Sequence, residues 1–184
     1  MLAPNWQIES AKIAAFELPV LKYLSQLSGV RPTIIVDTRE QDPLVFSRLP
    51  AKSGTLRTGD YSVFGLEKLF SVERKSVSDL VGCCMGDGRR RFEAELHRLR
   101  GYRFKRLLII GSELEIQQGV PFSQIRPAAV FGTLWAFEAR YDCPVVFRSD
   151  PEAAARQIEL WAFYFSRELV ESINNLWRAS NSMG

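Results

Sequence analysis

The sequence predicts an α/β domain in which helices flank a mixed central sheet. Short β-branched runs alternate along the chain with segments of helical spacing, a pattern typical of this class. The 184 residues suit one domain with a short extension, and a hydrophobic content of 46% is enough to fill a core. We therefore expect a main domain at residues 31–184 and a helical N-terminal extension at residues 1–30.

The first half of the main domain is predicted to be rich in strands. Residues 33–37 form a β-branched run that ends in an acid, which favours a buried strand. Residues 59–63 and 69–75 suggest two more strands with a turn near Gly65, whereas the prolines within residues 40–53 indicate a loop. We expect these strands to lie in one sheet.

Helices and strands alternate in the second half. A flexible break is expected at residues 86–88, followed by a helix that Gly101 ends and an apolar strand at residues 106–110. Residues 127–141 predict a helix with Pro127 in its first turn. A short strand at residues 145–147 precedes a last helix, capped by Asp150, that we expect to reach about residue 175.

Composition excludes several kinds of site. His97 is the single histidine, so a histidine pair or a His-rich metal site is excluded, and three cysteines without CxxC spacing argue against a zinc site. The net charge of +3 is mild. With no signal-peptide pattern and no apolar run near the ~20 residues of a membrane span, we expect a soluble, cytoplasmic protein.

Three acids and a lysine are the main candidates for chemistry: Asp37, Asp60, Glu73 and Lys75. The acids lie on predicted neighbouring strands, and their convergence would form a site for Mg²⁺, which prefers oxygen ligands. Glu73 and Lys75 are two residues apart and thus share one strand face, while Arg74 points away. Taken alone, these charges also fit a solvated strand surface, and Asp37 also fits a turn or cap residue.

The order of these residues resembles the XPF family of structure-specific nucleases. The elements are a VDxRE motif at residues 36–40, GDY at residues 59–61, ERKxxxDL at residues 73–80 and DGR at residues 87–89. A later segment around residues 129–145 is similar to the closing helix and strand of that domain, so the resemblance spans about residues 33–150. It implies a restriction-endonuclease-like fold of the PD-(D/E)xK type, in a compact member, as in bacteria or phages, that lacks the helix-hairpin-helix module.

The resemblance implies a divalent-metal-dependent DNA endonuclease that uses Mg²⁺ or Mn²⁺ and no organic cofactor. By matching position, Asp60 and Glu73 would bind metal with Asp37 in support, and Lys75 would be the catalytic lysine. Arg39, Arg74 and Arg89 match positions that meet phosphates, while Glu40 and Asp79 match supporting ones. Asp79 equally fits a helix cap. Relatives cut branched DNA, so flaps and single-strand/double-strand junctions are the expected substrates.

Basic residues follow the DGR element, from Arg89, Arg90 and Arg91 to Arg106. We interpret this cluster as a phosphate-contacting surface beside the active site, the alternative being a solvated helix face.

The aromatic residues of the last helix occupy more than one face, which fits either a core or a partner surface. Because XPF relatives pair through the equivalent of residues 130–141 and the next strand, a homodimer is expected. Two other functions remain as alternatives. One is a catalytically silent DNA-binding or scaffold subunit. The other is a glycosidase with paired carboxylates, a function in which Lys75 and the arginines would have no role.

Overall fold

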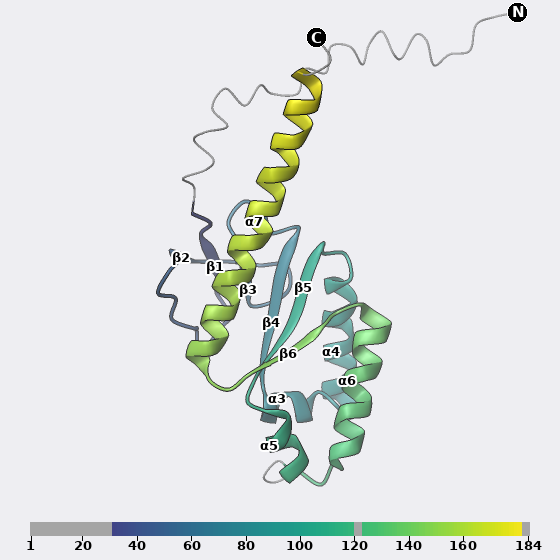
Figure 1. The fold of residues 1–184 in the computed structure, drawn as a ribbon. Helices are drawn as coiled ribbons and strands as arrows, with labels where there is room; N and C mark the ends of the chain where they lie inside the picture. Colours follow the sequence, from purple (N-terminus) through teal and green to yellow (C-terminus); the bar gives the residue numbers. More distant parts are fainter. Residues whose placement is uncertain (1–30, 120–122, 182–184) are drawn as a thin grey trace, which may run out of the picture. The chain divides into compact units, whose positions relative to one another are not determined.

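The structure is a computed structural model, and it describes residues 31–119 and 123–181. The helical extension expected at residues 1–30 lies outside the described residues. The described part is a six-stranded sheet with helices on both of its faces (Figure 1). The strands are β1 (Ile34–Asp37), β2 (Ala51–Gly54), β3 (Tyr61–Val63), β4 (Phe70–Ser76), β5 (Phe104–Ile110) and β6 (Val145–Arg148).

The sheet is mixed, as predicted. Its order is β2-β1-β3-β4-β5-β6. Strand β3 runs antiparallel to both of its neighbours, β1 and β4, whereas the pairs β1/β2, β4/β5 and β5/β6 are parallel. The predicted loop at residues 40–53 contains the start of β2, which the sequence did not suggest because its residues, AKSG, are small or polar and mostly exposed. Pairing with β1 makes it a strand.

Strand β5 separates two hydrophobic cores. Leu107 and Ile109 pack against the helices α3 (Val77–Gly82), α4 (Gly86–Leu99), α5 (Glu113–Gln118) and α6 (Pro127–Tyr141) on one face. Leu108 points to the opposite face, which helix α7 (Pro151–Asn181) covers. Side chains alternate between the two faces along a strand, which explains this arrangement, and burial on both faces explains why residues 107–110 are all apolar.

Helices α3 and α4 meet end to end beside β4. A capping box begins α3: the hydroxyl of Ser76 accepts from the Asp79 N–H, and the Asp79 carboxylate accepts from the Ser76 N–H. The expected flexible break at residues 86–88 is wrong, because α4 already begins at Gly86. Gly88 is needed there for close packing, since a Cβ on it would lie 2.3 Å from the carbonyl oxygen of Gly82.

The last helix is longer than predicted. It packs on the sheet through Ala154, Ala155, Ile158, Ala162 and Phe165, and it continues to Asn181, beyond the predicted end near residue 175. Figure 1 shows its final turns extending past the strands. Within the described ranges, no helix is both long and apolar enough to cross a membrane.

Candidate active site

Three acids lie in one row across the sheet. The register pairs Val36 with Tyr61 and Tyr61 with Val72, so Asp37 at the end of β1, Asp60 directly before β3 and Glu73 on β4 all lie next to this row. The N–H of Asp37 donates to the carbonyl of Asp60 at 2.8 Å. Strands are about 4.8 Å apart, so Asp37 and Glu73, at the ends of the row, are separated by roughly 10 Å. Asp60 lies between them.

Asp60 and Glu73 form a buried pair of like charges. Burial raises the pKa of Asp60 to about 6. The backbone N–H of Arg74 donates to Asp60 Oδ2 at 2.7 Å, and this bond lowers the pKa but does not offset the effect of burial. Burial raises the pKa of Glu73 to about 8, and repulsion from Asp60 acts in the same direction. Within the described residues nothing donates to Asp60 Oδ1 or Glu73 Oε2. Such a pair requires a proton or a cation, and its hard oxygens fit a divalent cation.

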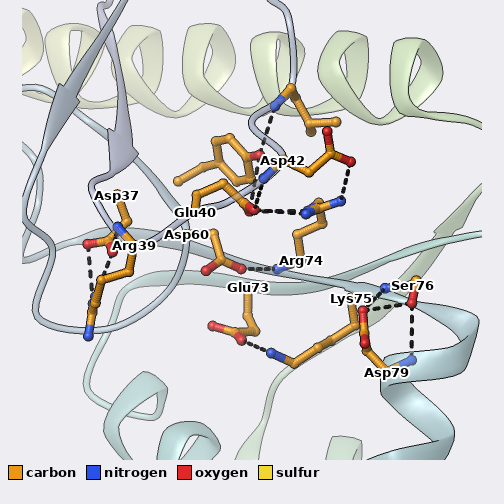
Figure 2. A network of polar contacts seen from close by, with 12 residues as sticks. Asp37, Arg39, Glu40, Asp42, Asp60, Glu73, Arg74, Lys75, Ser76 and Asp79 are labelled. Carbon is orange, nitrogen blue, oxygen red and sulfur yellow. Dashed lines mark hydrogen bonds and ion pairs between the residues drawn. The ribbon is translucent and has the colours of Figure 1, made fainter.

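Lys75 lies on the same strand face as Glu73. Its Nζ is 2.5 Å from Glu73 Oε1 and 5.4 Å from the centre of the Phe92 ring, and Figure 2 shows the side chain turned back toward Glu73. Burial opposes the charge on Lys75, but Glu73 more than offsets this and raises the lysine pKa. The lysine thus remains an ammonium donor beside the two carboxylates.

Asp37 is held away from this pair. Its carboxylate accepts from the backbone N–H, Nε and Nη2 of Arg39, and from the backbone N–H of Leu56 at 2.6 Å. Burial alone would raise the pKa of Asp37, but these bonds outweigh it and lower the pKa. The expected convergence of three carboxylates is therefore not observed: among the residues that the structure describes, no group of three His, Cys, Asp or Glu side chains is arranged to hold a metal.

Arg74 and Glu40 lie on the opposite face of the strand, as Figure 2 shows. Arg74 Nη2 is 2.8 Å from Glu40 Oε1, and the hydroxyl of Tyr61 donates to Glu40 Oε2 at 3.4 Å. Both charged side chains are largely buried, with 17% of Arg74 and 7% of Glu40 exposed. Arg74 therefore ties the loop after β1 to β4, and it also lines the groove described below.

An open groove runs beside these residues. Its walls come from residues 39–42, from residues 74–79 at the junction of β4 and α3, and from α4 between Gly88 and Glu95. Asp60 and Lys75 line it, and so does Asp79, whose carboxylate closes the cap of α3. Four basic and five acidic side chains border the groove, so its own charges are nearly balanced.

The basic cluster does not form one surface. Arg91 lines the groove, but Arg89 pairs with Glu93 and lies over the Phe137 ring, and Arg90 pairs with Asp87. Arg106 lies over the ring of Phe104, on the side of the sheet that α7 covers. Arg89, Arg90 and Arg91 follow one another around α4 and therefore point in different directions. Arg106 lies on β5, so these basic residues are close in sequence but lie on different surfaces.

Glu95 is a groove residue that the sequence analysis missed. Its carboxylate is 3.9 Å from Lys75 Nζ, and it lies on the same face of α4 as Arg91 and Phe92. Helical spacing is the signal that would have found it, because positions three or four residues apart share a helix face.

Comparisons with known proteins agree with this geometry. XPF from Aeropyrum pernix has a similar structure, with a TM-score of 0.58 and 24% identity over 71% of this chain and 60% of that chain. XPF from Aeropyrum pernix in complex with DNA has a TM-score of 0.58 and 21% identity over 75% of this chain and 66% of that chain. These likenesses confirm the restriction-endonuclease-like fold, and the chain spans less than two thirds of either XPF chain.

Among curated proteins, none matches the sequence significantly. The family model of the ERCC4 domain matches residues 36–160, which include Asp37, Asp60, Glu73 and Lys75. This match covers more than half of the sequence and confirms the XPF-type resemblance, so the chain belongs to the ERCC4-domain family.

Proposed function

We propose that the chain is a divalent-metal-dependent DNA endonuclease that uses Mg²⁺ or Mn²⁺. The observation that carries the proposal is the buried pair of Asp60 and Glu73, with Lys75 Nζ 2.5 Å from Glu73, at the side of an open groove. A bound divalent cation lowers the pKa of a water molecule and offsets charge on a phosphate. The basic and acidic side chains of the groove nearly balance, so a bound cation would add the positive charge that favours a phosphate beside Asp60 and Glu73.

The side chains have distinct roles in this proposal. Asp60 and Glu73 hold the cation through carboxylate oxygens. Lys75 donates from its ammonium to the phosphate as negative charge develops, or orients the attacking water. Asp37 holds Arg39 beside the site, where the guanidinium adds positive charge near Asp60 and Glu73. Hydrolysis would leave a 5′-phosphate and a 3′-hydroxyl, as the family resemblance implies.

A cleavage assay tests the proposal. Asp60→Asn and Glu73→Gln preserve side-chain size and should abolish Mg²⁺-dependent cleavage while DNA binding persists. Glu113→Gln, at an exposed position on α5, is the matched acid-to-amide control and should retain activity. Cleavage in excess EDTA, or full activity of Glu73→Gln, would contradict the proposal. Metal-independent DNA binding without any cleavage by the wild type would support the scaffold alternative.

The proposed substrate is DNA with a single-strand/double-strand boundary. The groove is open and offers few free positive charges, so it suits a strand that bends easily better than stiff duplex, whose bending costs about 1–6 kcal/mol. Contacts to backbone charge carry no sequence information, so no sequence preference is expected. Initial rates on flap, fork, single-stranded and blunt duplex DNA at one salt concentration test this, and equal rates on flap and blunt duplex would contradict it.

A homodimer through α6 and β6 is part of the proposal. Trp135 on α6 is 67% exposed beside Phe131, and β6 is an edge strand of the sheet. A second copy would bury both features symmetrically. Light scattering at tens of micromolar should give a dimer that Trp135→Glu dissociates, and a monomer for the wild type would refute this part.

A further inference from the structure

Glu95 has a different environment from the other acids of α4. Asp87 pairs with Arg90, and Glu93 pairs with Arg89 and approaches Arg140. Both acids therefore form ion pairs with arginines of the helices. Glu95 instead reaches across to β4, where its Oε2 lies 3.9 Å from Lys75 Nζ, and its side chain is 34% exposed in the groove wall. Lys75 therefore contacts two carboxylates that come from different elements.

The first of these contacts conflicts with metal binding. Lys75 Nζ donates a hydrogen bond to Glu73 Oε1 at 2.5 Å. Lys75 and Asp60 line the groove, whereas Glu73 is buried beside them. A divalent cation on Glu73 would withdraw charge from that oxygen and would repel the ammonium. Lys75 then needs another acceptor close by, because an ammonium that is largely buried and unpaired is costly.

The second contact meets that need. Glu95 is already within ion-pair distance of the ammonium, and a small rotation of either side chain would bring the two into hydrogen-bond contact. The Phe92 ring, 5.4 Å from Lys75 Nζ and one turn before Glu95 on the same helix face, limits where the ammonium can move. Lys75 would stay directed toward the groove instead of retreating into solvent.

We propose that Glu95 is a positioning residue that accepts the ammonium of Lys75 when Glu73 binds a divalent cation. The inference rests on the proposed function of Asp60 and Glu73. It gives Glu95 no direct bond to the metal, in keeping with the finding that, within residues 31–119 and 123–181, no three His, Cys, Asp or Glu side chains are arranged as a metal site. Removing such an outer partner typically costs about 10- to 100-fold in metal affinity.

Mn²⁺ titration calorimetry without DNA tests the inference in a double-mutant cycle of Glu95→Gln and Lys75→Met. Glu95→Gln alone should weaken Mn²⁺ binding about 10-fold, because Lys75 then competes for Glu73. In the Lys75→Met background the same change should matter less than about twofold, as expected when the interacting partner is already absent. Glu93→Gln, two residues away on α4, is the matched control and should bind Mn²⁺ like the wild type.

Each other outcome has a distinct meaning. Wild-type affinity in Glu95→Gln would overturn the inference and leave the proposed metal site intact. An equal loss with and without Lys75 would show that Glu95 acts on the metal directly, which also overturns the positioning role. Failure of the wild type to bind Mn²⁺ would remove the proposed function and the inference together.

Discussion

One methyl group at Gly88 should uncouple α3 from α4. A Cβ at this position would lie 2.3 Å from the carbonyl oxygen of Gly82 and 3.2 Å from its carbonyl carbon. Both atoms belong to the backbone, so no side-chain rotation relieves the clash. Gly88→Ala therefore forces the first turn of α4 away from α3, and with it Arg91 and Glu95 in the groove wall.

The expected loss follows from two opposing effects. Inserting a methyl group into a fully packed position costs about 1–3 kcal/mol, while alanine gains about 1 kcal/mol over glycine inside a helix. The free energy of unfolding should fall by up to about 2 kcal/mol, which lowers Tm by up to roughly 8 °C in a chain of this size. Gly132→Ala on α6 is the control, because a Cβ there meets nothing within 4 Å. It should stabilise the chain by about 0.5–1 kcal/mol.

Thermal unfolding followed by circular dichroism, together with cleavage rates, measures both variants. Gly88→Ala should lose stability and cleavage activity, whereas Gly132→Ala should gain stability at unchanged activity. If Gly88→Ala gained as much stability as Gly132→Ala, the close approach of the two helices would be refuted.

Three further predictions concern the polar network. Glu40→Ala leaves the largely buried Arg74 without its main partner and should cost about 3 kcal/mol in urea unfolding, against less than 1 kcal/mol for the exposed Asp42→Ala; equal losses would contradict the role of Glu40. Asp37→Ala removes the acceptor of the Leu56 N–H, so hydrogen exchange of that amide should accelerate, and an unchanged rate would count against this hydrogen bond. Because burial raises the pKa of Glu73 from 4.5 to about 8, the metal-free folded state keeps a proton that the unfolded state releases. The contribution of this proton to stability should be fully present below pH 4.5 and be lost as the pH rises toward 8; Glu73→Gln should lose this dependence, and an equal dependence in this variant would assign the titration elsewhere.

Local sequence patterns predicted the helices and strands whose buried apolar residues recur at regular helical or strand spacing. The helix at residues 127–141 was predicted with its observed bounds, because Pro127 fits the first turn and the apolar spacing is helical. The strand at residues 33–37 and the strand pair around Gly65 were predicted from β-branched runs and a turn residue. Strand β2 and helix α5 gave no such signal, since one is exposed and polar and the other buries little beyond Ile116.

The site could be predicted to the level of strand position but not of side-chain direction. Alternation placed Glu73 and Lys75 on one face and Arg74 on the other, as observed. The direction of Asp37 depends on Arg39 and on the N–H of Leu56, a contact between residues 19 positions apart that no local pattern shows. The arginines after Gly88 looked like one cluster because sequence proximity does not distinguish faces of a helix that packs against others.

Anomalous diffraction from crystals soaked in Mn²⁺ tests the central claim most directly. We expect a peak bonded to carboxylate oxygens of Asp60 and Glu73, at about 2.0–2.6 Å, the range for hard divalent cations. The peak should disappear in Glu73→Gln. A peak that persists in this variant, or that lies elsewhere on the domain while the crystallised protein cleaves DNA, would contradict the assignment of Asp60 and Glu73 as the metal site.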